Sequence, residues 1–94
     1  MEVLAVAVDP AGRPVELTRE RWAQIVGGHP ELREHRDDVE RAIRSPTAQL
    51  PGRVGGEVWF YLEGVGPCRY LKVVVRFRGA LGYVITAFAR RSMP

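Results

Sequence analysis

The sequence predicts a small α+β domain in which two N-terminal helices pack on one face of a twisted antiparallel sheet of about four strands. Helical spacing of apolar residues is found in the first half of the chain, whereas valine, isoleucine and aromatic residues dominate the second half. Glycine and proline clusters separate the segments. The 94 residues are enough for one domain, which we expect to extend over residues 1–94. Its core is small, so an open sheet face is a better candidate for a site than a deep pocket.

The first segments predict one strand and then a helix. Glu2–Val8 is rich in valine and alanine, which indicates a strand, and Asp9–Gly12 forms a turn because proline fixes φ and glycine closes it. Val15–Leu17 is either a short return strand or the lead-in to a helix. Thr18 is a suitable N-cap for a helix over Arg19–Val26, where apolar residues follow helical spacing.

A second helix is expected directly after the first. Gly27-Gly28 ends the first helix, and Pro30 suits the first turn of a helix over Glu31–Arg44. The apolar residues of that segment fall on one face, and its charged residues form a solvated face. Ser45-Pro46 ends the helix, because the residue before a proline avoids the α conformation.

The second half of the chain predicts an antiparallel meander. Thr47–Leu50 is a short strand, and Glu57–Glu63 is a strand with aromatic and aliphatic residues in alternation. The last part is a β-hairpin with strands Tyr70–Phe77 and Tyr83–Ala89, joined by a turn within Arg78–Gly82. One face of this sheet packs on the helices, and the other is partly open.

The two faces of the first hairpin strand differ in charge, because successive strand residues point to opposite faces. The apolar core face consists of Leu71, Val73, Val75 and Phe77. The cationic face consists of Tyr70, Lys72, Val74, Arg76 and Arg78. Lys72 is the only lysine in the chain, and packing does not require it there. We expect its ammonium to point towards water, either to hold a phosphate or simply to be solvated.

The length of the hairpin loop decides where Thr86 lies. An odd number of loop residues places Ile85 opposite Val75 and puts Thr86 on the cationic face, whereas an even number puts Thr86 on the core face. We favour the odd loop because it adds Tyr83, Ile85 and Ala87 to the core face. The cost is that Val84 and Phe88 are left partly exposed.

The charge of the chain is distributed unevenly. From Cys68 to the end there are six basic residues and no acidic one, whereas residues 1–67 contain eight basic and eleven acidic residues. The overall net charge of +3 therefore conceals a strongly basic C-terminal part. Such an asymmetry indicates a polyanionic partner, and RNA is the partner we expect.

The composition disfavours several kinds of site and location. The single Cys68 excludes an internal disulfide, and one cysteine with two histidines is too few for a typical zinc site, so we expect no metal and no cofactor. No apolar run approaches the ~20 residues of a membrane span, and the start lacks the basic segment of a signal peptide. We therefore expect a cytoplasmic protein without a membrane partner.

Five segments of the chain resemble a known family. They are LTRERWAQIVGGHPEL, ERAIRSP, PGRVGGEVWFY, RYLKVVVRF and GYVITAF, and they extend over Leu17–Phe88. The pattern resembles the small phage and bacterial domains of the barnase–EndoU–colicin–RelE nuclease superfamily. The resemblance implies a small α+β domain with helices on one side of an antiparallel sheet. It also implies a metal-independent ribonuclease, which in many members is the toxin of a toxin–antitoxin or phage-conflict system.

The resemblance selects the candidate catalytic residues. The matching positions are His29 after the first helix, Lys72 and Arg76 on the central strand, and Thr86 on the last strand. An acidic catalytic residue, found in barnase-like members, would be Glu57 in this chain.

Cleavage of RNA without a metal needs a base for the 2′-hydroxyl, cations for the charge on the phosphorane and an acid for the departing 5′-oxygen. Histidine exchanges protons near neutral pH, so His29 is a candidate base or acid. Lys72 and Arg76, taken as neighbours ~6.6 Å apart on one strand face, suit one phosphate or two adjacent ones. Thr86 can donate a hydrogen bond to a phosphate oxygen. Further substrate contacts are expected from Tyr61, Tyr70 and Arg78, the tyrosines by stacking on unpaired bases.

Each of these residues also has a structural interpretation. His29 lies at a corner between two helices, where a histidine often only caps the preceding helix, and His35 lies on a solvated helix face. Arg76 can form an exposed ion pair with Glu57 or Glu63 across the sheet. Two other functions stay open, namely a non-catalytic RNA-binding module and a protein-interaction domain for a small acidic antitoxin-like protein. The oligomeric state is open as well.

Overall fold

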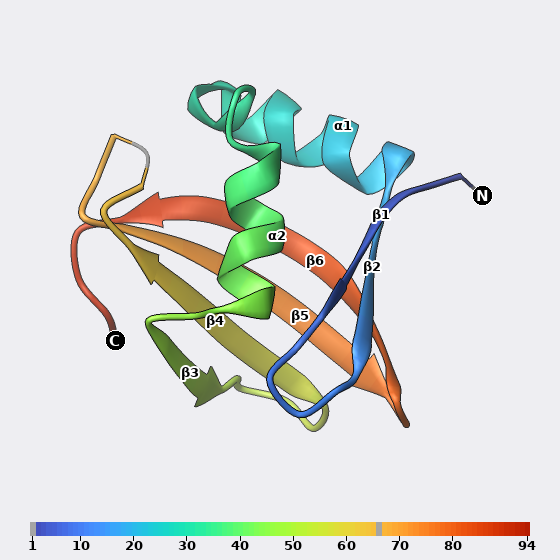
Figure 1. Ribbon diagram of the computed structural model, residues 1–94. Coiled ribbons are helices and arrows are strands. Elements are labelled where there is room, and N and C mark those ends of the chain that lie inside the picture. The colour runs from blue at the N-terminus through green and yellow to red at the C-terminus, as the bar shows by residue number, and fades with distance from the viewer. Residues whose placement is uncertain (1, 66) are drawn as a thin grey trace.

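The computed structural model describes residues 2–65 and 67–94, and within them it contains one six-stranded sheet and two α-helices (Figure 1). The elements are β1 (Val3–Val8), β2 (Pro14–Thr18), α1 (Arg19–Gly28), a 3₁₀ turn (Pro30–Leu32), α2 (Arg36–Arg44), β3 (Ala48–Pro51), β4 (Glu57–Glu63), β5 (Tyr70–Arg78) and β6 (Leu81–Arg90). The strand order across the sheet is β1-β2-β6-β5-β4-β3. In this part of the chain, no helix combines the length and the apolar character needed to cross a bilayer.

The α+β class is confirmed, but the sheet is larger than expected and it is mixed rather than wholly antiparallel. Val15–Leu17 belongs to a return strand, β2, which pairs antiparallel with β1. β2 also pairs in parallel with β6, through Val15 with Gly82 and Glu16 with Tyr83. The other neighbouring strands are antiparallel. The parallel pair joins two segments far apart in the sequence, so no local pattern predicts it.

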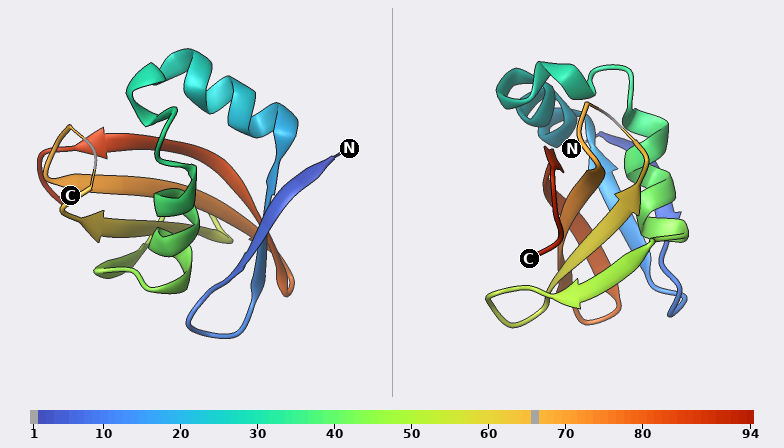
Figure 2. Two further views of the ribbon diagram at one scale, coloured as in Figure 1. Left: turned by 45° about the horizontal axis from the view of Figure 1, so that its top comes forward. Right: turned by 90° about the vertical axis from the view of Figure 1, so that its left-hand side faces the viewer.

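Local capping signals set the start of α1 but not that of α2. The Thr18 hydroxyl accepts a hydrogen bond from the backbone N–H of Arg21 at 3.1 Å, which makes it the expected N-cap. The helix expected over Glu31–Arg44 is shorter, because Pro30–Leu32 forms a 3₁₀ turn and α2 begins only at Arg36. Figure 2 shows α2 crossing one face of the sheet, while α1 runs along β2 and β6.

The hydrophobic core lies between the helices and one face of the sheet, the inner face. α2 contributes Val39, Ala42 and Ile43, and packs against β1, β4 and β5. The inner face of β4, β5 and β6 contributes Phe60, Leu62, Leu71, Val73, Val75, Phe77, Val84 and Ala87. The outer face of these strands, turned away from α2, carries Glu57, Trp59, Tyr61, Tyr70, Lys72, Val74, Arg76, Tyr83, Thr86, Phe88 and Arg90.

The hairpin of β5 and β6 has an even loop, and the expected odd loop is wrong. Arg78 pairs with Leu81, so only Gly79 and Ala80 form the loop. Gly79 has a φ of +63°, a conformation that two-residue hairpin loops require and that glycine adopts without strain. With this loop alone, Thr86 would lie on the core face.

A β-bulge at Ile85 compensates for the even loop. Val75 pairs with Val84 and Val74 pairs with Thr86, so Ile85 has no partner of its own on β5. The bulge shifts the following residues by one position. Thr86 therefore shares the outer face with the cationic residues, as expected, although for a different reason. Ile85 lies half-buried at the bulge rather than in the core, where we expected it.

The same shift corrects the expected positions of other β6 residues. Val84 is buried on the inner face, although we expected it to be partly exposed. Tyr83 pairs with Arg76 and lies on the outer face rather than in the core. Ala87 is buried in the core and Phe88 is half-buried on the outer face, as expected.

Candidate functional site

Lys72 lies at the centre of the outer face, but it is buried, with only 5% of its surface exposed. Our expectation that it points freely into water is therefore wrong. Its Nζ atom lies 3.5 Å from the centre of the Trp59 ring, and 5.6 Å from the centres of the Tyr61 and Phe88 rings. Tyr61 and Phe88 are the register partners of Lys72 on β4 and β6. Strand pairing thus builds an aromatic cage of Trp59, Tyr61 and Phe88 around the lysine.

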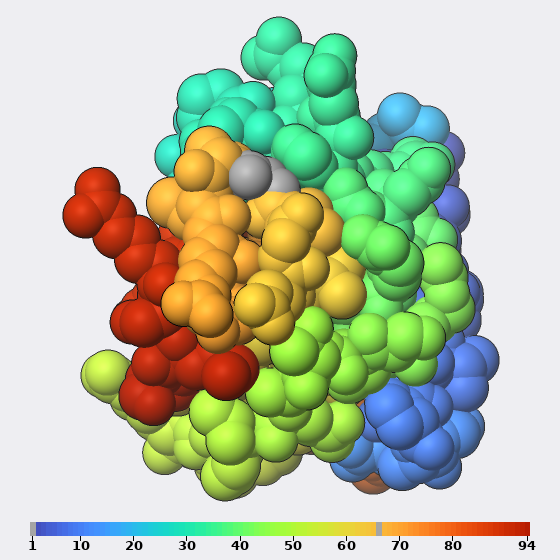
Figure 3. All heavy atoms as spheres, turned by 60° about the vertical axis from the view of Figure 1, so that its left-hand side comes forward, coloured from blue at the N-terminus to red at the C-terminus, as the bar shows by residue number. Residues whose placement is uncertain are grey.

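The positive charge of Lys72 has no anionic partner in direct contact. Within residues 2–65 and 67–94, no carboxylate forms an ion pair or a hydrogen bond with its ammonium. Burial lowers the pKa of Lys72, and the charges of Arg90 and Arg53 lower it further, against a smaller opposing effect of Glu57. In Figure 3 the C-terminal segment, in red, lies beside the yellow-green segment that precedes β4. The two arginines come from these segments and make the site electropositive.

The ammonium of Lys72 is surrounded by aromatic rings. In the part of the chain that the structure describes, Tyr61 Oη is the buried side-chain N or O atom that lacks a hydrogen-bond partner. Lys72 Nζ lies over the Trp59 ring and beside the Tyr61 and Phe88 rings, so ring faces rather than a carboxylate meet its charge.

His29 lies beside the same aromatic cage. Its ring stacks on the Phe88 ring, with the centres 5.7 Å apart and the planes at 30°. The backbone N–H of His29, and not its side chain, caps α1 by donating to the Ile25 carbonyl at 2.8 Å. His29 Nδ1 lies 3.7 Å from a Glu31 carboxylate oxygen, which leaves Nε2 directed elsewhere. Helix capping thus explains the position of the His29 backbone, but it gives no role to the imidazole, which is 38% exposed.

Arg76 lies further from Lys72 than we expected. The two residues are four positions apart on β5, which separates their Cα atoms by ~13 Å rather than ~6.6 Å. They can contact different phosphates of one strand, but not a single phosphate. Arg76 Nη2 lies 3.8 Å from Glu57 Oε2, so the structural pair that we considered is present. Thr86 is half-buried opposite Val74, between the two cations on the outer face.

Arg78 is exposed at the hairpin loop and lies even further along β5 from Lys72. It can extend a basic surface but does not join the cluster around Phe88. His35 lies at the start of α2, where its Nδ1 is 2.9 Å from Asp38 Oδ2. This contact agrees with the structural role that we expected for His35.

Tyr61 and Tyr70 are not available as stacking platforms for bases. Tyr61 is 0% exposed and Tyr70 is 8% exposed, and their rings pack edge to face with centres 6.5 Å apart. Burial raises the pKa of Tyr61, partly offset by the charge of Arg90. We expected both tyrosines to be exposed to solvent, because their positions along the strands place them on the outer face. The aromatic and arginine side chains that crowd this face bury them instead.

We predict that Tyr61→Phe stabilises the protein. The Tyr61 hydroxyl is buried without a hydrogen-bond partner among the described residues, so removing it should raise the free energy of unfolding by about 1 kcal/mol. Urea denaturation followed by tryptophan fluorescence measures this change. Tyr83→Phe is the matched control, since Tyr83 is half-exposed and its hydroxyl has water available. A loss of stability in Tyr61→Phe would mean that the hydroxyl has a bonded water in solution.

Glu57 holds neighbouring groups in place through its carboxylate. Its Oε1 accepts a hydrogen bond from Trp59 Nε1 at 2.7 Å and one from the backbone N–H of Arg53 at 3.3 Å. The Trp59 bond, more than any other contact, lowers the pKa of Glu57, with smaller contributions from Arg53 and Arg76 and with burial opposing. The carboxylate is therefore ionised at neutral pH, the form that a general base requires. The acidic catalytic residue that the resemblance placed at Glu57 stays a prediction. Glu57 also fixes the indole that covers Lys72.

Sequence reasoning missed four residues that surround Lys72, namely Arg53, Trp59, Phe88 and Arg90. From the sequence, Phe88 was described only as partly exposed, and no role was given to Arg53, Trp59 or Arg90. The alternation of side chains along β4 could have revealed Trp59, because it lies on the same face as Tyr61, the residue that pairs with Lys72. Phe88 had a signal too, because the odd loop that we favoured already places it on the outer face opposite Lys72.

The described residues contain no group of three histidine, cysteine, aspartate or glutamate side chains placed to hold a metal ion. Comparisons of the chain with family models, curated proteins and solved structures found no match.

Proposed function

We propose that this protein is a metal-independent endoribonuclease whose outer sheet face binds the RNA backbone around Lys72 and His29. The observation that carries the proposal is the buried ammonium without a carboxylate partner among the described residues. Burying an unpaired charge opposes folding, which points to a role for this ammonium beyond folding. Together with Arg53 and Arg90, Lys72 makes a site suited to a phosphate.

The proposed reaction is the transfer of the phosphoryl group to the neighbouring 2′-oxygen. His29 Nε2 takes the 2′-hydroxyl proton, the 2′-oxygen attacks phosphorus, and the bond from phosphorus to the 5′-oxygen breaks. Lys72 stabilises the negative charge of the phosphorane. Its lowered pKa makes it a better donor of the proton that the departing 5′-oxygen takes up. The products are a 2′,3′-cyclic phosphate and a 5′-hydroxyl.

The resemblance of residues 17–88 to the barnase–EndoU–colicin–RelE nucleases is a second support, since it points to the same reaction. We propose membership of that superfamily, with a toxin role as the corresponding biological setting. Thr86 and Arg76 then contact the backbone beside the cleaved bond, and Arg78 extends the basic surface towards the hairpin loop.

The proposal is tested by incubating the folded protein with single-stranded RNA and with transfer RNA in the presence of EDTA. We expect cleavage, with 2′,3′-cyclic phosphate ends on the products. Intact RNA at micromolar protein would overturn the proposal. Salt-dependent binding without cleavage would identify a non-catalytic RNA-binding module instead.

A protein partner is a second candidate, and the edge strand β1 favours it. β1 contains no charged residue, and its outward side chains Val6 and Val8 are 53% and 49% exposed. Uncharged edges of this kind accept an added strand from another chain. A small acidic protein bound there, as in a toxin–antitoxin pair, is compatible with RNA cleavage on the outer face.

A further inference from the structure

The Glu57 carboxylate contacts three separate parts of the outer face. Its Oε1 accepts a hydrogen bond from Trp59 Nε1 at 2.7 Å and another from the backbone N–H of Arg53 at 3.3 Å. Its Oε2 lies 3.8 Å from Arg76 Nη2. The Glu57 side chain is only 14% exposed. One carboxylate therefore joins the loop before β4, the indole that covers Lys72 and a cation of β5.

The loop between β3 and β4 is closed around Glu57. The backbone N–H of Gly52 donates to the Glu57 carbonyl at 2.8 Å. A Cβ atom added at Gly52 would lie 2.7 Å from Glu57 Cβ, which is too close for two carbon atoms, so the side chain lies flat against the loop only because residue 52 is glycine. The next residue is Arg53, one of the charges that, after burial and Arg90, lower the pKa of Lys72. The closed loop thus brings a second cation to the lysine.

The indole of Trp59 extends the influence of Glu57 to Lys72. Tyr61 and Phe88 are the register partners of Lys72 and are held beside it by strand pairing. Trp59 lies two positions before Tyr61 and is only a diagonal neighbour of the lysine. Its ring is nevertheless the nearest to Lys72 Nζ, at 3.5 Å from the ring centre. The hydrogen bond from Trp59 Nε1 to Glu57 fixes the indole in this orientation.

We infer that Glu57 is a positioning residue that holds the Arg53 and Lys72 cations in place for a phosphate of the RNA, an inference that rests on the proposed function for its substrate. Oε1 accepts two hydrogen bonds and Oε2 faces Arg76, so the carboxylate acts through these neighbours. A displacement of about 1 Å in such a site can lower a rate by about 10²-fold. The alternative role is that of the general base, and the two roles predict different effects of substitution.

Glu57→Gln and Glu57→Ala separate positioning from catalysis. Glutamine keeps an oxygen that accepts the hydrogen bonds of Trp59 and Arg53, but it takes up no proton at neutral pH. Single-turnover RNA cleavage by Glu57→Gln should stay within about threefold of the wild type, whereas Glu57→Ala should be slower by about tenfold or more. An equal loss of about 10²-fold in both variants would assign Glu57 as the base and overturn the positioning role. Wild-type cleavage by Glu57→Ala would overturn both roles.

Nuclear magnetic resonance of Lys72 tests the positioning role without RNA. Lys72 is the only lysine in the chain, so isotope-labelled lysine gives a single ε-methylene signal. The ring current of Trp59, which lies against the ammonium, shifts this signal upfield of its position in free lysine. Glu57→Gln should keep the shift, and Glu57→Ala should move the signal towards that of free lysine. An unmoved signal in Glu57→Ala would overturn the inference even if RNA is cleaved. The expected movement in a protein that cleaves no RNA would overturn the proposed nuclease alone.

Gly52→Ala gives a second test, which does not depend on the folding of Glu57→Ala. The added Cβ displaces the Glu57 side chain and leaves its charge in the protein. The Lys72 signal should move in the same direction as in Glu57→Ala, and cleavage should again be slower by about tenfold. Thermal unfolding verifies that each variant is folded. A folded Gly52→Ala protein with the wild-type signal and rate would contradict the inference.

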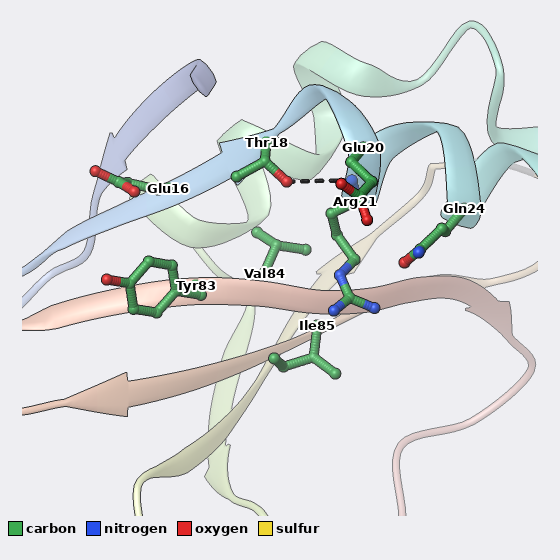
Figure 4. A pocket seen from close by; sticks show the side chains of 8 residues that line it. All are labelled: Glu16, Thr18, Glu20, Arg21, Gln24, Tyr83, Val84 and Ile85. Carbon is green, nitrogen blue, oxygen red and sulfur yellow. Dashed lines mark hydrogen bonds between the residues drawn. The ribbon is translucent and has the colours of Figure 1, made fainter. Parts of the chain in front are cut away.

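Two other carboxylates are matched controls. Glu63, at the other end of β4, also lies beside an arginine, at 3.7 Å. Glu16 is half-buried as Glu57 is, and Figure 4 shows it at one end of a pocket of about 200 Å³ between α1, β2 and β6. Glu63→Ala and Glu16→Ala each remove one negative charge, and should change cleavage by less than about twofold and leave the Lys72 signal in place. A loss in both that equals the loss in Glu57→Ala would reduce the effect to net charge and overturn the positioning role.

Discussion

Replacing Lys72 with methionine is expected to make the protein more stable at pH 7 and to abolish RNA cleavage. Methionine fills the aromatic cage with a chain of similar length, and its sulfur contacts aromatic rings favourably. It removes the desolvation of an ammonium that has no anionic partner among the described residues, on a lysine that is only 5% exposed. Against this stands the loss of the cation–π contact with Trp59. We expect a net gain of about 1 kcal/mol in the free energy of unfolding.

The gain should depend on pH in a defined direction. Burial lowers the pKa of Lys72 in the folded protein below its ordinary value of 10.5. Between the folded and unfolded pKa values the unfolded chain binds more protons, so the stability of the wild type rises with pH in that window. Lys72→Met lacks this rise, and its advantage should shrink as pH approaches 10.5.

Urea denaturation of the wild type and Lys72→Met at pH 7, 9 and 10 measures the effect. Subtracting the two free energies of unfolding cancels the contributions of groups that both proteins share, such as the ionisation of Tyr61. A methionine variant that is less stable than the wild type at pH 7 would contradict the argument, because the aromatic cage would then stabilise the ammonium. A stable variant that cleaves RNA at the wild-type rate would remove Lys72 from the reaction.

His29→Ala is expected to lower the rate of RNA cleavage by about 10²- to 10⁴-fold, the usual contribution of a general acid or base. The variant should remain folded, because the backbone of His29 and not its ring caps α1. RNA affinity should change little, since the imidazole is not the main cation of the site. Single-turnover cleavage and equilibrium binding, measured on the same RNA, distinguish these two effects.

His35→Ala is the matched control for His29→Ala. Both histidines are partly exposed, but His35 contacts Asp38 at the start of α2, away from the aromatic cage. Its removal should leave cleavage unchanged. Equal cleavage by the wild type and His29→Ala would assign His29 to packing on Phe88, and would leave the outer face as a binding surface only.

The parts of the fold that were predictable depend on local signals. Thr18 is an N-cap by chemistry alone, and the hairpin strands follow from residue type and glycine placement. The parallel pairing of β2 with β6 was not predictable, because Val15 and Gly82 are far apart in the sequence and carry no mutual signal. The predicted loop length was wrong, because the bulge at Ile85 shifts the pairing by one residue and gives Thr86 and Phe88 the partners that an odd loop would give them.

Two members of the candidate site, Lys72 and His29, were predictable, but the residues that surround them were not. Lys72 and His29 were selected from charge, parity and resemblance, and both do contact Phe88. The burial of Lys72 follows from its cross-strand neighbours, and these require the register. The exposure of Tyr61 was predicted wrongly for the same reason, because side-chain alternation gives the face on which a residue lies but not the side chains that cover it.

The bulge at Ile85 makes the outer face independent of this one residue. If Ile85 were deleted, Val84 would still pair with Val75 and Thr86 would still pair with Val74, because the bulged residue has no partner of its own on β5. Phe88 would stay opposite Lys72. A chain that is one residue shorter at this position can therefore form a regular hairpin with the same outer face, whereas a regular strand that kept Ile85 would turn Thr86 and Phe88 to the other side of the sheet.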